Sequence, residues 1–169
     1  YCTARYTAIM KIADIVQGDL EEVWSLNQAS VPHVSSIELS EMQWFATHAH
    51  YFRVARLGDE LAGFLIGLRP GLPYRSPNYR WFSENYCDFG YIDRVAVSAT
   101  ARRNGVATRL YQDFAASLDT AVGVLTCEVN TRPANDSSMR YHERYGFVRV
   151  GTQQTEGGKK EVAVLEMKL

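Results

Sequence analysis

Arg102-Arg103-Asn104-Gly105-Val106-Ala107 connects an apolar, strand-like run to a helix-like run. The strand-like run covers residues 89–97, and the helix-like run covers residues 108–118. The free N–H groups of a first helical turn and the helix dipole together favour a phosphate at this position. Gly105 lets the backbone approach a ligand closely, and the two arginines add positive charge and hydrogen-bond donors. The turn therefore predicts a site for a phosphorylated ligand.

Composition limits the class of protein. The chain has 169 residues, of which 46% are hydrophobic, which suits one domain with its own core. Its net charge of −1 argues against a nucleic-acid-binding protein. No apolar run is long enough to span a membrane, and residues 1–6 show no signal-peptide core. We expect residues 1–6 to be a tail. We expect a single domain over residues 1–169, without nucleic-acid or membrane partners.

Cysteines and histidines give no pattern typical of a metal site. Cys2, Cys87 and Cys127 are odd in number and widely spaced, which fits reduced thiols in a cytoplasmic protein. His48 and His50 form a His-x-His pair, but no carboxylate or cysteine stands at clear ligand spacing. We expect surface or helix-end histidines and no metal.

Hydrophobic periodicity predicts strands alternating with helices, and hence an α/β or α+β sheet. We expect Ser40 to cap the second helix and Gly146 to end the last one. The predicted strands are residues 7–13, 51–57, 60–68, 89–97, 125–129, 147–153 and 160–169. The predicted helices are residues 14–27, 40–48, 108–118 and 135–145.

Residues 69–88 are predicted to form a long loop with three prolines and five large aromatic residues. Long loops inside compact domains are often functional. Tyr74, Trp81 and Tyr86 either wall a substrate pocket or cover the sheet as a small additional core. The sequence alone does not favour either alternative.

Three segments together carry a family resemblance. They are Asp93-Arg94-Val95-Ala96-Val97, the turn at residues 102–107, and residues 135–147, which begin with Asn135 and end with Gly146-Phe147. In this order they resemble the GNAT superfamily of N-acetyltransferases, whose turn pattern is Gln/Arg-x-x-Gly-x-Gly/Ala. The resemblance extends from about residue 7 to residue 169.

The resemblance implies a mixed, mostly antiparallel sheet of about six or seven strands, flanked by about four helices. The two central strands would splay apart to admit the thioester of acetyl-coenzyme A, whose pyrophosphate would lie on the turn. The residues it implies at the cofactor are Val95, Ala96, Val97, Arg102, Arg103, Asn104, Gly105, Val106, Ala107, Thr108, Asn135 and Ser138.

An amine acceptor needs a base, because a primary amine with a pKa of about 10 is protonated at neutral pH. Asp93 is our candidate for the base or for binding the ammonium group. Alternation along a strand would place it on one face with Tyr91, Val95 and Val97. The alternative is an ion pair between Asp93 and Arg94.

The departing thiolate gains from a general acid. The resemblance places this position at His142, where the family often has tyrosine. The seven-residue spacing from Asn135 puts His142 on one helical stripe with Ser138. We favour His142 over Tyr141, while protonation by water is nearly as good an alternative.

Two further polar residues lie near the predicted gap. Asn130 either binds the acceptor or caps a turn, and we include it with Tyr74, Trp81 and Tyr86 as a candidate substrate-binding residue. Glu128 is either a second carboxylate near the gap or a solvated residue, and we expect it to be solvated.

The sequence thus predicts an acyltransferase that acetylates a primary amine, with a small molecule favoured as acceptor. The alternatives are acetylation of a protein or peptide amine and an acyl-coenzyme A-binding module without chemistry. The C-terminal strand is exposed to pairing between subunits, so a homodimer is possible.

Overall fold

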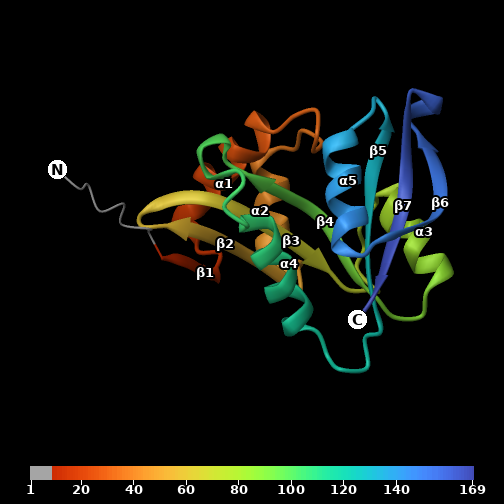
Figure 1. Cartoon of the computed structure of the whole chain (residues 1–169), viewed down its shortest axis with the longest axis horizontal. Coiled ribbons are helices and arrows are strands. Elements are labelled where there is room, and N and C mark those ends of the chain that lie inside the picture. The colour runs from red at the N-terminus through yellow and green to blue at the C-terminus, as the bar shows by residue number, and fades with distance from the viewer. Residues whose placement is uncertain (1–8) are drawn as a thin grey trace.

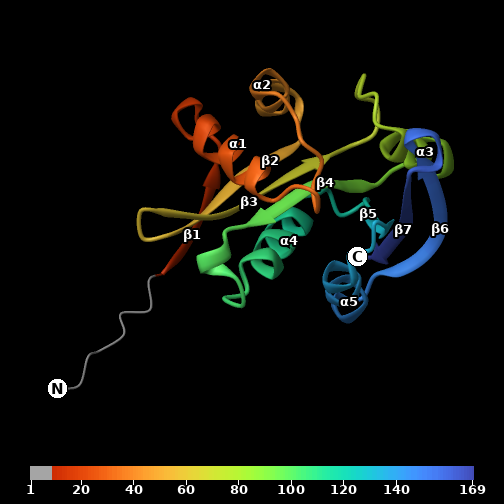
Figure 2. The same ribbon diagram turned by 90° about the horizontal axis from the view of Figure 1, so that it is seen from above.

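The computed structural model describes residues 9–169. Within that range the chain forms one seven-stranded sheet with helices on both faces (Figures 1 and 2). The strand order is β1-β2-β3-β4-β5-β7-β6, and every neighbouring pair is antiparallel except β4 and β5. The strands are β1 (Met10–Asp14), β2 (Tyr51–Leu57), β3 (Glu60–Leu68), β4 (Gly90–Val97), β5 (Val124–Arg132), β6 (Val148–Thr155) and β7 (Lys160–Lys168).

Two helices cover each face of the sheet, and one further helix packs near its β6–β7 end. Helices α1 and α2 lie on one face, whereas α4 and α5 lie on the other (Figure 2). Helix α3 lies beside β6 and β7 (Figure 2). The helices of the described residues are α1 (Leu20–Ala29), α2 (Leu39–His48), α3 (Pro77–Asn85), α4 (Val106–Ser117) and α5 (Asp136–Tyr145).

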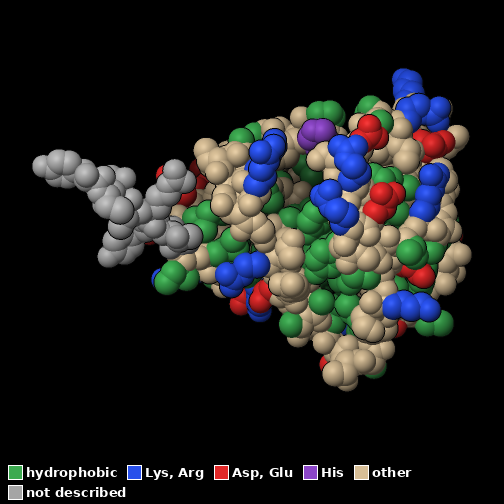
Figure 3. All heavy atoms as spheres, in the orientation of Figure 1, with side chains coloured by type: hydrophobic (Ala, Val, Ile, Leu, Met, Phe, Trp, Pro, Cys, Tyr) green, Lys and Arg blue, Asp and Glu red, His purple; other side chains and the backbone are tan. Residues whose placement is uncertain are grey.

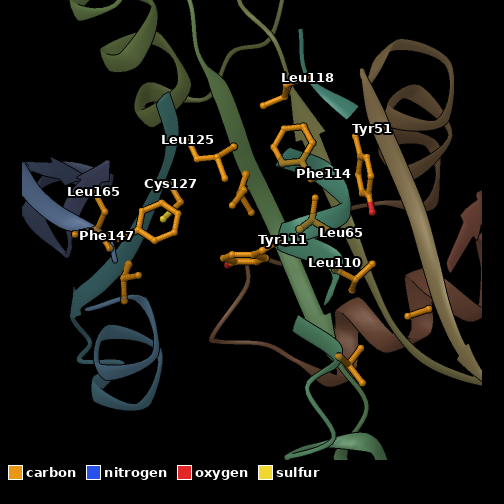
Figure 4. Packing of buried hydrophobic residues seen from close by; sticks show 14 of the residues in the cluster. Tyr51, Leu65, Leu110, Tyr111, Phe114, Leu118, Leu125, Cys127, Phe147 and Leu165 are labelled. Carbon is orange, nitrogen blue, oxygen red and sulfur yellow. The ribbon is translucent and has the colours of Figure 1, made fainter. Parts of the chain in front are cut away.

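The sheet separates two hydrophobic cores. The core under α4 and α5 contains Tyr111 and Phe114 of α4 together with Phe147, which follows α5 (Figure 4). The opposite core contains Phe45 of α2 and Phe82 of α3. Because both sheet faces are covered, β3 is buried at every position from Leu61 to Leu68.

The parallel strands β4 and β5 remain paired only at one end. Their register partners are Gly90 with Leu125 and Tyr91 with Thr126. Beyond these two pairs the strands diverge, as Figure 1 shows between β4 and β5. The predicted splayed sheet is therefore confirmed, and the cleft described below opens at this divergence.

The main error of the sequence prediction is helix α3, which lies inside the predicted loop of residues 69–88. The Ser76 hydroxyl accepts a hydrogen bond from the backbone N–H of Tyr79, and Pro77 occupies the first helical turn. Serine at the N-cap and proline at the first position both favour a helix start. The clustered prolines and aromatic residues concealed this signal.

Other helix boundaries also differ from the prediction. Helix α2 begins at Leu39 with Glu38 at its N-cap, so Ser40 lies inside the helix and does not cap it. A short 3-10 turn, Gln17–Asp19, precedes α1 where the prediction had continuous helix from residue 14. The first strand begins at Met10, and residues 7 and 8 of the predicted strand lie outside the described range.

The residues that flank α5 agree with the prediction at both ends of the helix. The Asn135 side chain accepts a hydrogen bond from the Ser138 N–H at 3.2 Å and caps the start. Gly146 ends the helix with φ of 119°, a left-handed conformation that favours glycine.

Cys87 is exposed and Cys127 is buried, both as free thiols, while Cys2 lies outside the described residues. No helix within residues 9–169 has the length and apolar character needed to cross a membrane.

Candidate active site

A cleft of about 1340 Å³ opens where β4 and β5 diverge. Its walls come from both splayed strands, the turn before α4, helix α5, the α1–α2 connection and the segment that leads into α3. One end therefore lies at the predicted phosphate site, and the other lies between the α1–α2 connection and the turn between β6 and β7.

The phosphate end is formed by backbone in an unusual conformation. Arg103 and Gly105 have φ of 66° and 72°, both in the left-handed region. Gly105 is the N-cap of α4, and no side chain caps the helix there. The N–H groups of the first turn are thus left for a ligand, as an anion-binding helix start requires. This turn fits the pyrophosphate of acetyl-coenzyme A.

The surface around this end is positively charged. Figure 3 shows Lys and Arg side chains on both sides of a hollow on the face that carries α4 and α5. Arg102 and Arg103 line the cleft from the turn, and Arg144 lines it from α5. Their charges complement the phosphates of the expected cosubstrate.

Eleven of the twelve residues expected at the cofactor line the cleft; Asn104 does not. The Asn104 amide donates hydrogen bonds to the carbonyl oxygens of Ala101 and Arg102, at 3.1 and 3.4 Å. Asn104 therefore shapes the turn from behind. The eleven are Val95, Ala96, Val97, Arg102, Arg103, Gly105, Val106, Ala107, Thr108, Asn135 and Ser138.

Asp93 lies in the cleft wall, where its carboxylate forms an ion pair with Arg94. Its Oδ2 accepts a hydrogen bond from Arg94 Nε at 3.0 Å, and both side chains are only 4% exposed. The register of β4 against β3 shifts at Asp93, because Ile66 pairs with Arg94 and Gly67 pairs with Ile92. Such a bulge interrupts strand alternation.

The bulge corrects the predicted grouping of side chains on β4. Val95 and Val97 pack into the core under α4, whereas Tyr91 belongs to the opposite core. Arg94 lies over the Phe45 ring of α2 at 5.5 Å, and Asp93 accompanies it through the ion pair. Asp93 therefore does not share a face with Val95 and Val97.

Arg94 connects this ion pair to the α1–α2 connection. Its guanidinium donates to Asn27 Oδ1 at 2.9 Å and to the Ser35 carbonyl at 3.1 Å. A third hydrogen bond reaches Ser35 Oγ at 3.2 Å. Ser35 lines the cleft, so Arg94 fixes one wall of its acceptor end.

Glu128 on β5 is a cleft residue, and the expectation of a solvated side chain is wrong. Its Oε2 accepts a hydrogen bond from the Tyr91 hydroxyl at 2.8 Å, and its Oε1 accepts one from Asn78 Nδ2 at 3.0 Å. Burial, with a smaller effect from the negative charge of Asp93, raises the pKa of Glu128 to about 7. Both donors come from segments that the sequence places far from Glu128, so no local signal pointed to this arrangement.

His142 lines the cleft from α5, and both of its ring nitrogens are hydrogen-bonded. Its Nδ1 is 2.8 Å from the Ser138 carbonyl oxygen, which only accepts, so Nδ1 carries the proton. Its Nε2, 2.9 Å from the Tyr111 hydroxyl, then accepts from Tyr111. Burial lowers the pKa of His142, so the neutral ring is favoured. In this state His142 has no free proton to donate.

Tyr141, the second candidate for the acid, faces the cleft from α5. Its hydroxyl lies 3.2 Å from Thr108 Oγ1 at the start of α4. Burial raises the pKa of Tyr141 to about 12, so its hydroxyl keeps the proton at neutral pH.

Of the four predicted substrate-binding residues, Tyr74 and Asn130 line the cleft, and Trp81 and Tyr86 do not. Tyr74 stacks on Trp44 of α2 with ring centroids 5.8 Å apart, which makes an aromatic wall at the acceptor end. Tyr86 donates a hydrogen bond to Glu166 of β7 at 2.6 Å, and Trp81 packs edge-on against Phe82. Trp81 lies on α3 and Tyr86 is its C-cap, and neither lines the cleft.

The two histidines of the His-x-His pair bond separately to the backbone. His48 Nδ1 is 2.8 Å from the Trp44 carbonyl oxygen, and His50 Nε2 is 3.2 Å from that of Ser117. Within residues 9–169, no three His, Cys, Asp or Glu side chains form a group suited to a metal ion.

Known structures of similar fold agree with this architecture. The chain is similar to Ard1 from Thermoplasma volcanium, with 19% identity, a TM-score of 0.75, and coverage of 95% of this chain and 97% of that one. It is also similar to the ribosomal-protein-S18-alanine N-acetyltransferase from Escherichia coli, with 13% identity, a TM-score of 0.71, and coverage of 95% and 94%. A putative phosphinothricin N-acetyltransferase shares 17% identity at a TM-score of 0.68, with coverage of 95% and 99%.

No curated protein sequence matches the chain. The model of the acetyltransferase (GNAT) family matches residues 19–147, which include the diverging strands, the turn before α4 and helix α5. The chain therefore belongs to the GNAT family of acetyltransferases, acyltransferases that use acetyl-coenzyme A.

Proposed function

We propose that the protein transfers an acetyl group from acetyl-coenzyme A to a primary amine, with Glu128 as the proton acceptor. The observation that carries this proposal is the Glu128 carboxylate in the cleft between β4 and β5, bonded to Tyr91 and Asn78, with a pKa of about 7. The bound cosubstrate would supply an activated acetyl thioester. The residues of the chain bind the acceptor and move its proton.

Glu128 suits the proton transfer that an amine acceptor requires. A primary amine has a pKa of about 10 and must lose a proton before it attacks. A general base works best when its pKa lies near the operating pH. Glu128 meets this condition, and in accepting the proton its Oε atom forms an O–H bond as the ammonium N–H bond breaks.

Asp93 was our first candidate for the base, and its role remains a prediction. Its carboxylate is nearly inaccessible and accepts a hydrogen bond from the Arg94 guanidinium. We therefore propose that Asp93 is the ion-pair partner that holds Arg94 in place. The negative charge of Asp93 also disfavours ionisation of Glu128.

Tyr141 is the group we propose to protonate the departing sulfur. It reaches the cleft and retains its hydroxyl proton, whereas the ring proton of His142 is held by the Ser138 carbonyl. His142 then serves to orient Tyr111 and to join α5 to α4.

A small-molecule acceptor is favoured by the aromatic wall of Trp44 and Tyr74, which suits a compact, partly apolar amine. A protein or peptide amine is the second candidate. It is favoured by the wide acceptor end, where the cleft reaches both residues 33–37 and the turn at Thr155 and Glu156. A module that binds acyl-coenzyme A without chemistry is the remaining alternative.

The test is the pH dependence of kcat/KM, measured by thiol release with an acceptor from a panel of amines and short peptides. We expect kcat/KM to rise with pH and to level off above about 7, because only ionised Glu128 accepts a proton. Glu128→Gln should lower kcat by about 10²-fold or more and remove this rise. Full activity of Glu128→Gln at every pH would rule out this role.

A further inference from the structure

Helix α3 lies between β3 and β4 in the chain and brings one polar side chain of its first turn to the catalytic carboxylate. We propose that Asn78 is a positioning residue that fixes the Glu128 carboxylate and keeps it ionisable in the working range of the enzyme. This inference rests on the proposed function of Glu128, and it assigns a role to a segment outside the motifs that identify the family.

The contacts determine how the carboxylate is held. Each Glu128 oxygen has one donor, the Asn78 amide for Oε1 and the Tyr91 hydroxyl for Oε2. The two donors come from different elements, α3 and β4, on either side of β5. A carboxylate held at both oxygens loses its freedom to rotate, so its remaining lone pairs keep a fixed direction.

The orientation of the Asn78 amide is itself determined. Gln153 of β6 donates from Nε2 to Asn78 Oδ1 at 3.1 Å. The Asn78 oxygen is thereby turned to Gln153, and its NH₂ group is turned to Glu128. Asparagine is suited to this position because its side chain accepts on one side and donates on the other.

The first turn of α3 is fixed in place by Tyr79, the residue after Asn78. Tyr79 is buried, and its hydroxyl donates to the Arg69 carbonyl at 2.7 Å and accepts from the Leu72 N–H at 3.0 Å. With the Ser76 cap and Pro77, these bonds set the first turn and hence the Asn78 side chain.

The charges around Glu128 explain why a donor is needed. Burial and the negative charge of Asp93 both favour the protonated carboxyl, whereas Arg94, Tyr91 and Asn78 favour the carboxylate. The thiol of Cys127 and the hydroxyl of Tyr111 also lie near this group. On β7 the register partner is Val164, which carries no charge. Removing the Asn78 donor therefore shifts the balance toward the protonated, inactive carboxyl.

The inference can be tested without knowing the acceptor. In protein labelled with ¹³C at the glutamate carboxyl carbons, NMR titration reports the Glu128 midpoint, with its signal assigned from Glu128→Gln. We expect Asn78→Leu to raise that midpoint by about 1 to 2 pH units, because hydrogen bonds to charged groups have this strength. Asn85→Leu is the matched control on α3 and should leave the midpoint unchanged, since among residues 9–169 the Asn85 side chain bonds only to the Trp81 carbonyl.

A kinetic measurement separates this inference from the proposed function. Once an acceptor is found, the acid limb of kcat/KM should shift to higher pH in Asn78→Leu. If Glu128→Gln abolishes turnover while Asn78→Leu leaves both the midpoint and the acid limb unchanged, only the role of Asn78 is wrong. If Glu128→Gln is fully active, the proposed base is wrong whatever Asn78 does.

Discussion

Arg94→Met should destabilise the protein strongly, because it removes one partner of a buried ion pair. The side chains of Asp93 and Arg94 are each 4% exposed, and their charged atoms lie 3.0 Å apart. The substitution leaves the Asp93 carboxylate buried without its cation. It also removes the donors to Asn27 and Ser35 that hold the α1–α2 connection on β4.

The size of the effect follows from these contacts. Removing one partner of a buried ion pair costs about 3–5 kcal/mol in the free energy of unfolding. For a domain of this size, each kcal/mol lowers Tm by about 2–4 °C, so we expect Tm to fall by roughly 6–20 °C. Since the free energy of unfolding of a typical domain is about 5–15 kcal/mol, the variant should fold but lose a large part of that free energy.

Urea unfolding followed by tryptophan fluorescence measures the loss. Arg132→Met is the control, because Arg132 pairs with Glu161 at 3.3 Å with its side chain 54% exposed, and such pairs contribute about 0–1 kcal/mol. Adding Asp93→Asn to Arg94→Met should recover part of the loss, since no unpaired charge remains buried. A loss below about 1 kcal/mol in Arg94→Met, equal to the control, would refute the reasoning.

Two further substitutions test the packing and the proposed acid. Gly67→Ala should lower the free energy of unfolding by about 1–3 kcal/mol, because the new Cβ would lie 2.5 Å from the Phe114 ring; an unchanged thermal midpoint would contradict this. Tyr141→Phe should lower kcat by about 10²-fold, measured by thiol release, without weakening the binding of acetyl-coenzyme A, measured by calorimetric titration. His142→Leu should instead act on stability, by about 1–3 kcal/mol, through the lost bond to Tyr111; a larger kinetic effect than that of Tyr141→Phe would reverse the two roles.

The fold was predictable from the sequence where local signals coincide with tertiary structure. The hairpin of β2 and β3 turns at Gly58-Asp59, and α5 has Asn135 at its N-cap and Gly146 at its C-cap, close to the predicted ends. Helix α3 was missed because its nine residues contain a proline at the start and three aromatic residues. These residues read as loop until Ser76 is recognised as the cap.

The turn before α4 could be predicted as part of the site because one continuous stretch forms it, and its residues line the cleft. The surroundings of Glu128 could not be predicted, because their contacts join residues distant in sequence. Asn78 and Tyr91 lie 50 and 37 residues from Glu128, so periodicity gave no sign that this carboxylate is bonded on both sides. The bulge at Asp93 likewise depends on pairing with β3, which simple alternation does not represent.

The central claim is that the turn before α4 and the diverging strands bind acetyl-coenzyme A. Calorimetric titration of the wild type and of Gly105→Glu tests it most directly, because Gly105 is the N-cap beside the free N–H groups. Gly58→Glu is the matched control: Gly58 has φ of 63° against 72° for Gly105, neither new Cβ meets another atom within 4 Å, and Gly58 does not line the cleft. We expect binding by the wild type and by Gly58→Glu, and its loss in folded Gly105→Glu. Equal binding by all three proteins, or none by the folded wild type, would contradict the account.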